Sequence, residues 1–307
     1  MKYLLGILLL SFTCCRLAQT QSVEKTDFAL KNAPGVSCVW VTPKTGAVKG
    51  VVMLIAGFGE TAEGALTETR IPTALCERGM MAVVVGLGAH MYADSSVMAT
   101  LDEVTAAVQE RYHPECECMA IGGFSIGGAI ALRYAERCHE QPEQHPLSPK
   151  AVFAIDAPVD LIELWDYFER EIARNFDPVG VAEAKYVSEL LKREIGTPAE
   201  NRALYEALTP YCHRCPAPGN ERFLKNTAVR VYHDMDLDWY LKNKKRSAYD
   251  CNFLNASAFI AQLLQTGNEQ ATFVSGKTGY RSDGTRNPHA WSIVDEQELA
   301  MWIDKMF

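Results

Sequence analysis

A serine flanked by glycines lies at position 125 of this 307-residue chain. The segment Gly123-Phe124-Ser125-Ile126-Gly127 has the pattern G-x-S-x-G, with an apolar run before it and an apolar segment after it. This order is typical of a strand, a sharp turn and a helix, with a strained, exposed serine at the turn. The flanking glycines lack Cβ atoms, so the strand and the helix can approach closely. The pattern therefore indicates a nucleophilic serine, and the Ile126 N–H at the helix start could stabilise an oxyanion.

A serine nucleophile needs a base to take its proton and an acid to orient that base. An acidic cluster, Asp234, Asp236 and Asp238, follows one late expected strand, and His289 follows the next. The chain order is therefore serine, acid, histidine, with each group at the end of a different strand. His233 adjoins the acidic cluster, and we expect it to serve local hydrogen bonding.

The elements expected around these residues alternate between buried strands and helices. The clearest strand patterns are the apolar runs at 51–55, 81–87 and 151–155. Such alternation predicts right-handed crossovers and a mostly parallel α/β sheet flanked by helices. Ligand sites in such sheets lie at the carboxyl ends of the strands. Ser125, Asp156 and the loop Ala56-Gly57-Phe58-Gly59-Glu60 should all lie at that edge.

The alternation breaks between about 159 and 226. Three helical patterns follow one another there, at 161–176, 181–195 and 199–208. A segment of this length is too long for an ordinary connection, so it predicts a helical cap inserted into one domain of residues 23–307. Trp165, Tyr167 and Phe168 could line a substrate pocket or pack the core of the cap.

Composition narrows the function classes. The chain is 48% hydrophobic and 22% charged, with a net charge of −8, which disfavours nucleic acid and anionic membrane surfaces as partners. No phosphate-binding loop, zinc spacing or dinucleotide fingerprint occurs, so we expect neither a cofactor nor a metal. The sequence does not fix the oligomeric state.

Residues 1–22 resemble a secretory signal peptide. Lys2 precedes an apolar run from Tyr3 to Phe12, which is too short for a membrane span. We expect export to the periplasm or the extracellular space. Lipidation of Cys14 would make the chain a lipoprotein and give it a membrane contact. The segment 20–35 is polar, and we expect it to be a loose N-terminus of the mature chain.

Ten cysteines are present, and eight remain beyond Cys14 and Cys15. An even number in an exported chain suggests disulfides. The pairs in Cys116-Glu117-Cys118 and Cys212-His213-Arg214-Cys215 could each supply partners.

Four features together resemble the α/β-hydrolase fold from about residue 36 to 307: the nucleophile elbow Gly123 to Gly127, the Gly-rich loop Gly57 to Gly59, the acidic cluster and His289. The stretches YHDMDLDWYLKNKKRSAYD and GYRSDGTRNPHAWSIVDEQEL are more narrowly similar to exported Bacteroidetes serine hydrolases and esterases. The resemblance implies Ser125 as nucleophile, His289 as general base and Asp236 as acid, with Asp238 or Asp234 as alternatives. It also implies oxyanion donors at the backbone N–H groups of Phe58 and Ile126. The lipase-type HGGG signature is absent, because Ala56-Gly57 stands at that loop.

We therefore expect an exported serine hydrolase that forms an acyl-enzyme, with a small-molecule ester or acyl compound as substrate. Peptidase-type hydrolysis is an alternative within the class. A binding protein that keeps the fold without turnover is a second hypothesis, which the altered oxyanion loop favours. A surface lipoprotein partner of a larger assembly is a third, which requires lipidation of Cys14.

Overall fold

The computed structural model of the chain describes residues 23–44, 47–113 and 119–307. The signal peptide, Cys14 and the Cys116-Glu117-Cys118 segment lie outside the described residues. Within them, one sheet has the strand order β1-β2-β4-β3-β5-β6-β7-β8. The strands are β1 (Val23–Asp27), β2 (Ser37–Pro43), β3 (Val51–Ile55), β4 (Met81–Gly86), β5 (Met119–Phe124), β6 (Pro149–Ile155), β7 (Ala228–Asp234) and β8 (Ala271–Gly276).

The sheet is mostly parallel, as the sequence predicts. β4, β3, β5, β6, β7 and β8 pair in parallel, whereas β1 and β2 are antiparallel at one edge. The parallel strands end at one common edge, and this edge carries the site described below.

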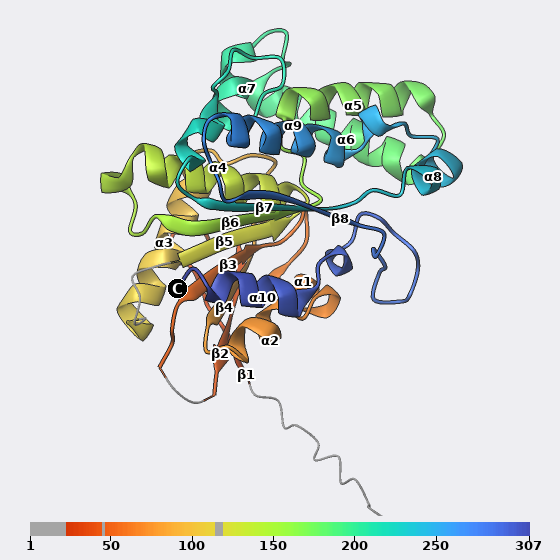
Figure 1. Cartoon of the computed structure of the whole chain (residues 1–307). Coiled ribbons are helices and arrows are strands. Elements are labelled where there is room, and N and C mark those ends of the chain that lie inside the picture. Colours follow the sequence, from red (N-terminus) through yellow and green to blue (C-terminus); the bar gives the residue numbers. More distant parts are fainter. Residues whose placement is uncertain (1–22, 45–46, 114–118) are drawn as a thin grey trace, which may run out of the picture.

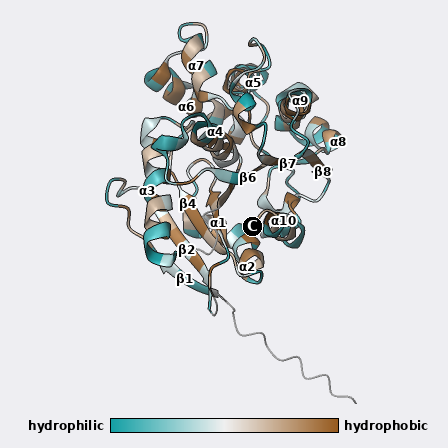
Figure 2. Ribbon diagram, turned by 60° about the vertical axis from the view of Figure 1, so that its left-hand side comes forward, coloured by the Kyte–Doolittle hydropathy of each residue, from teal (hydrophilic) through white to brown (hydrophobic). Residues whose placement is uncertain are grey.

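Helices cover both faces of the sheet (Figure 1). α1 (Ala62–Glu68), α2 (Ile71–Cys76) and α10 (Glu296–Asp304) pack on one face, and α3 (Ser95–Tyr112), α4 (Ile126–Glu140) and α9 (Asn252–Gln265) pack on the other. β3 is buried on both faces, because Met53 and Ile55 join one apolar layer while Val52 and Leu54 join the other. This explains the continuous apolar sequence of the central strands, which Figure 2 shows as hydrophobic colour along β4.

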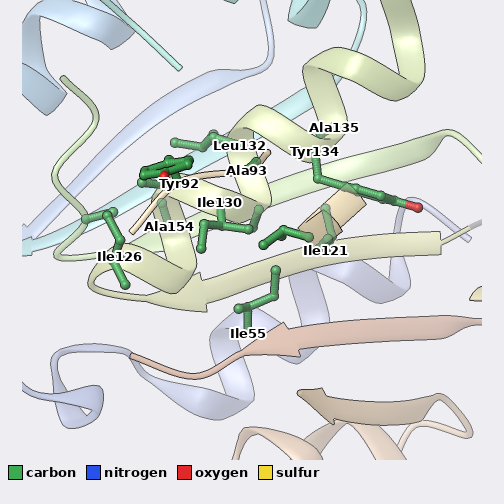
Figure 3. Packing of buried hydrophobic residues seen from close by; sticks show 14 of the residues in the cluster. Ile55, Tyr92, Ala93, Ile121, Ile126, Ile130, Leu132, Tyr134, Ala135 and Ala154 are labelled. Carbon is green, nitrogen blue, oxygen red and sulfur yellow. The ribbon is translucent and has the colours of Figure 1, made fainter. Parts of the chain in front are cut away.

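The apolar layer under α4 holds the serine-bearing turn in place. Ile55, Ile121 and Ile130, from β3, β5 and α4, lie close together in this layer (Figure 3). All three side chains are at most 1% exposed. Burial of each such side chain contributes about 1.5–3 kcal/mol, which stabilises the packing beneath the turn that carries Ser125.

Two predictions about local structure are corrected. The segment 20–35 is not loose throughout, since β1 pairs with β2 from Val23 to Asp27. An edge strand of this kind is held by backbone hydrogen bonds and needs no apolar alternation. The polar sequence of β1 therefore shows no strand pattern. The sequence at 65–78 predicts one helix, but the structure divides this region into α1 and α2, with extended backbone at Thr69 between them.

The cap expected near 159–226 contains α5 (Leu161–Arg174), α6 (Pro178–Ile195) and α7 (Arg202–Leu208), which lie above the sheet in Figure 1. Cys212 and Cys215 form a disulfide in the loop after α7. The other cysteines of the described part are buried free thiols: Cys38, Cys76, Cys138 and Cys251. No helix in the described residues is long and apolar enough to cross a membrane.

Candidate active site

Ser125 lies at the turn between β5 and α4. Its backbone has φ 54° and ψ −128°, a strained conformation for a residue with a side chain. The Ser125 N–H donates to the Ile155 carbonyl at 2.8 Å, and the Ser125 carbonyl accepts from Gly128 N–H at 3.0 Å. The strain is therefore held by the neighbouring strand β6 and by the first turn of α4.

The flanking glycines are required by close backbone contacts. A Cβ atom at Gly123 would lie 2.5 Å from the Ile55 carbonyl oxygen, and one at Gly127 would lie 2.3 Å from the Ala56 carbonyl oxygen. Both distances are too short for any side chain. The glycines of the motif thus allow α4 to approach β5 closely, as the sequence predicts, and also allow it to pack against the end of β3.

His289 is held by Asp156. The Nδ1–H of His289 donates to Asp156 Oδ2 at 2.5 Å. A proton at Nδ1 leaves Nε2 as the acceptor nitrogen, which is the tautomer that a general base for serine needs. The loop of His289 is fixed locally, because the Asn287 side chain accepts from the His289 N–H and donates to its carbonyl. The His289 ring also packs against Phe124, with 4.6 Å between the ring centroids.

Asp156 directly follows β6. Its N–H donates to the Tyr232 carbonyl at 2.8 Å, and its own carbonyl accepts from the Asn252 amide at 2.8 Å. The backbone φ is 43°, in the left-handed region that aspartate tolerates better than most residues. Burial alone would raise the pKa of Asp156, but hydrogen bonds from His233 and His289 and the charges of these rings hold it well below its ordinary value. Asp156 is therefore an anion at neutral pH.

This geometry corrects the predicted acid. Asp236 is engaged elsewhere, since it pairs with Arg286 at 3.1 Å and Lys277 at 3.5 Å. Asp234 accepts from Arg286 at 2.8 Å and from the Gly279 N–H at 2.9 Å. The acidic cluster thus anchors the loop that leads to His289, and Asp156 is the carboxylate that orients the imidazole.

The third aspartate of the cluster, Asp238, is exposed and has no hydrogen bond or ion pair in the part of the chain that the structure describes. It therefore does not orient His289 either. The sequence predicts Asp156 at this sheet edge but indicates no role for it there. The signal that could have identified it is its position directly after a buried parallel strand.

Ser125, Asp156 and His289 line one cavity of about 140 Å³ between the sheet edge and the cap. Of the three aromatic residues that could line a pocket or pack the cap, Tyr167 and Phe168 line the cavity while also packing in or against the core, and Trp165 only packs against the core. The Ser125 hydroxyl makes no hydrogen bond to any group of the described residues, His289 included. Such hydrogen bonds are often absent before substrate binds and form in the complex.

The predicted oxyanion donors lie at the same cavity. Phe58 and Ile126 both line it, and neither backbone N–H donates to another group within the described ranges. The adjacent Gly57 N–H is occupied, because it donates to Glu60 Oε2 at 2.9 Å. Glu60 also accepts from the Trp291 indole N–H at 3.2 Å. Glu60 therefore ties the Gly-rich loop to the loop of His289 and leaves Phe58 and Ile126 as the free donors.

Charged side chains from the segment after β7 line the cavity beside the cap. Lys244 and Arg246 line it, and each is paired with a cap carboxylate: Lys244 with Asp177 at 2.6 Å and Arg246 with Glu171 at 2.9 Å. Asp250 also lines it and accepts from Arg170 and Arg174 of α5. These pairs join the cap to the segment after β7. No group of three or more metal-ligating side chains occurs in the described residues.

Comparison with solved structures shows that the chain has a known fold. The chain is similar to carboxyl esterase 2 from the fungus Tuber melanosporum, with a TM-score of 0.62 and 13% identity over 94% of this chain and 88% of that one. It is also similar to MPT51 of Mycobacterium tuberculosis, with a TM-score of 0.61 and 13% identity over 92% and 98%. A hormone-sensitive lipase from a metagenome library gives a TM-score of 0.58 and 12% identity over 95% and 89%.

The fold is that of the α/β hydrolases. At these identities the likeness shows the fold alone. No protein-family model matches the chain, and no curated protein matches it either. The comparisons confirm the resemblance to α/β hydrolases and their esterases, and they do not support the narrower likeness to Bacteroidetes proteins.

Proposed function

We propose that the chain is an exported serine hydrolase that cleaves carboxylic esters through an acyl-enzyme. The observation that carries this proposal is the convergence of Ser125, His289 and Asp156 at one cavity, with His289 fixed in the tautomer of a base. The esterases among the similar structures support the class of substrate. Export is inferred from the sequence of residues 1–22 alone.

The mechanism follows from the atoms that face the cavity. Ser125 Oγ attacks the ester carbonyl carbon while His289 Nε2 takes the hydroxyl proton. The carbonyl oxygen becomes an oxyanion, which the N–H groups of Phe58 and Ile126 stabilise. The protonated imidazole gives its proton to the leaving alkoxide, and the alcohol departs. Water then attacks the acyl-enzyme by the same route, releases the acid and restores Ser125.

The size and lining of the cavity limit the acyl group. A volume of about 140 Å³ is close to that of a cavity that holds a benzene molecule, so it accommodates a short acyl group. Leu164, Phe168 and Val187 provide apolar surface on the cap side, and charged side chains lie beside them. A short acyl chain fits this space better than a long one, and the absence of an HGGG loop agrees with a non-lipase substrate.

The test is hydrolysis of p-nitrophenyl esters from acetate to decanoate by protein that lacks residues 1–22. We expect turnover that is highest for the short esters and is lost in Ser125→Ala. A fluorophosphonate probe should label the wild type and not the variant. Turnover that survives in Ser125→Ala would overturn the assignment of the nucleophile. Labelling without ester turnover would redirect the search to peptide substrates, assayed with short peptidyl anilides.

A non-catalytic binding protein is the second candidate. The observation that favours it is the free Ser125 hydroxyl, which lacks a hydrogen bond to His289 in the described structure. Absence of both ester turnover and fluorophosphonate labelling in a correctly folded sample would select this candidate over the hydrolase.

A further inference from the structure

A second histidine holds the same carboxylate. The Nδ1–H of His233 donates to Asp156 Oδ1 at 2.7 Å, while His289 donates to Oδ2 at 2.5 Å. Each oxygen of Asp156 therefore accepts from one imidazole, in a chain His233–Asp156–His289. His233 comes from the end of β7, and it does not line the cavity. It cannot touch a substrate there, so any effect on chemistry must pass through Asp156.

The burial of His233 shows that the hydrogen bond to Asp156 is its main polar contact. The His233 side chain is 0% exposed, and its ring stacks on Phe273 with 5.3 Å between centroids and 14° between planes. Its Nε2 is buried and has no hydrogen-bond partner in the described structure. An unsatisfied buried polar atom costs about 1–3 kcal/mol, so an apolar side chain would suit this position better if packing alone mattered.

We propose that His233 is a positioning residue, which fixes the carboxylate plane of Asp156 and thereby sets the orientation and basicity of His289. Its consequence for ester hydrolysis rests on the proposed function. Its effect on the His289 ring does not, since that effect exists in the folded protein without any substrate.

The physical reason lies in the carboxylate. The terminal torsion of aspartate is broad, so one hydrogen bond to Oδ2 leaves the carboxylate free to turn. A second donor on Oδ1 fixes its plane. A donor also withdraws part of the negative charge, as charge-assisted hydrogen bonds do. Without His233, Oδ1 would be buried without a donor, more charge would face His289, and a proton on His289 would be better stabilised.

Other titratable groups face this chain of three residues from neighbouring elements. The charge of Glu60 acts on His289 from the Gly-rich loop. Tyr240 and Cys251 lie near Asp156. Burial is the largest cause of the raised pKa of both groups, and the charge of Asp156 raises it further. Asp234, beside His233 in the chain, is neutralised by Arg286. In the part of the chain that the structure describes, the two histidines are the only side chains that donate to the Asp156 carboxylate.

The experiment compares four variants of the mature chain. His233→Leu removes the donor, and His233→Asn places an amide N–H near the position of Nδ1. His233→Gln places its amide near the position of Nε2, so it keeps polarity without the donor. Phe273→Leu removes the ring that stacks on His233 and controls for packing alone. Two readouts are taken against pH: the titration midpoint of the His289 ring by nitrogen-resolved NMR, and the rate of Ser125 labelling by a fluorophosphonate.

We expect the His289 midpoint and the acidic limb of labelling to move to higher pH by about 0.5–1 unit in His233→Leu and His233→Gln. His233→Asn and Phe273→Leu should titrate like the wild type. If His233→Leu does not fold, the pair His233→Asn and His233→Gln decides. An unchanged His289 midpoint in folded His233→Gln would overturn the inference. A shifted midpoint in a protein that the probe never labels would overturn the hydrolase proposal and leave the positioning role intact.

Discussion

Asp156 Oδ2 lies 2.5 Å from His289 Nδ1, although 133 positions separate the two residues in the chain. Asp156 directly follows β6, whereas the acidic cluster begins at Asp234, the last residue of the neighbouring strand β7, and continues with Asp236 and Asp238. Because β6 and β7 are adjacent and parallel, an acid at the end of either strand could reach the same imidazole. Here the side chain at the end of β7 that points to this region is His233, and it donates a hydrogen bond to Asp156.

The acid assignment is tested by a matched pair of substitutions. Asp156→Asn keeps the shape of the side chain but removes the charge that holds the correct tautomer of His289. We expect ester turnover to fall by about 10⁴-fold, the size of effect known for loss of a triad acid. Asp236→Asn should change turnover by less than about 10-fold, since within the described residues its carboxylate pairs with Arg286 and Lys277 and accepts from the Trp239 N–H, not from His289. Steady-state kinetics on a short p-nitrophenyl ester would measure both.

The reverse result, a large loss in Asp236→Asn and a small one in Asp156→Asn, would restore the acid that the sequence predicted. Circular dichroism and thermal unfolding of both variants would exclude loss of fold as the cause, because Asp156 accepts one buried and one partly buried hydrogen bond.

A second prediction concerns Glu60, which accepts from both the Gly57 N–H and the Trp291 indole. Loss of the Glu60 carboxylate would release the Gly-rich loop, and the Phe58 N–H would then no longer be held at the cavity. We expect Glu60→Ala to lower kcat by about 10-fold or more, approaching the 10²–10³-fold loss seen when an oxyanion donor is deleted. Glu60→Gln retains an acceptor for Gly57 and should keep most of the activity. Equal loss in both variants would contradict the positional role.

Glu60 also gives a pH signature. Burial, the largest cause, raises the pKa of Glu60 above its ordinary value of 4.5, although its hydrogen bonds oppose the shift. Just above pH 4.5 the folded state therefore binds more protons at Glu60 than the unfolded state does. Its contribution to the free energy of unfolding is present at low pH and declines as the pH rises through the raised value. Urea titrations at a series of pH values should show this slope in the wild type and not in Glu60→Gln.

A third prediction concerns the attachment of the cap. The side chain of Asp250 is 2% exposed and accepts from Arg170 at 2.8 Å and Arg174 at 2.6 Å, both on α5. Loss of its charge in Asp250→Asn should lower the free energy of unfolding by about 1–3 kcal/mol, since among the described residues Arg170 keeps only the Tyr249 carbonyl and Arg174 keeps only Glu171 as a partner. Asp166→Asn is the matched control, because Asp166 pairs with Arg214 at a more exposed site and should cost less than about 1 kcal/mol.

The same carboxylate sets an acid limit. Burial opposes ionisation of Asp250, but the arginines and Ser247 hold its pKa below the ordinary value of 3.8. Its contribution to stability is therefore complete above about pH 4 and is lost as the pH falls toward the lowered value. Acid denaturation of Asp250→Asn should begin from a lower stability and show a weaker dependence on pH in this window. An unchanged acid transition would contradict the role of Asp250 in holding the cap.

Much of the fold could be predicted because local patterns and global topology agree. β3 begins and ends where the apolar run at 51–55 predicts, and the spacing of Gly123 and Gly127 reflects the close backbone contacts of the nucleophile turn. β1 was missed because an edge strand depends on backbone pairing, which leaves no side-chain pattern.

The acid could not be predicted because the tertiary structure determines which carboxylate contacts His289. Asp156 and Asp236 both follow parallel strands, and the sequence does not record which carboxylate faces His289 and which faces Arg286. Only the path of the loop that carries Arg286 and His289 decides between them. The same holds for His233, whose role depends on the distance to a residue 77 positions away.

The last prediction tests the packing of the nucleophile elbow. At Gly127 an added Cβ would lie 2.3 Å from the Ala56 carbonyl oxygen and 2.4 Å from that of Ile55, both backbone atoms that cannot move alone. Gly127→Ala must therefore push α4 away from β3, which disturbs both the strained Ser125 and the oxyanion loop that follows Ala56. We expect loss of Ser125 labelling together with at least about 1–3 kcal/mol of lost stability, the usual cost of overpacking a core. Gly35→Ala is the control, because a Cβ there meets no atom within 4 Å and should leave labelling and stability unchanged. Wild-type labelling in Gly127→Ala would mean that the helix is not held against β3 as tightly as these distances require.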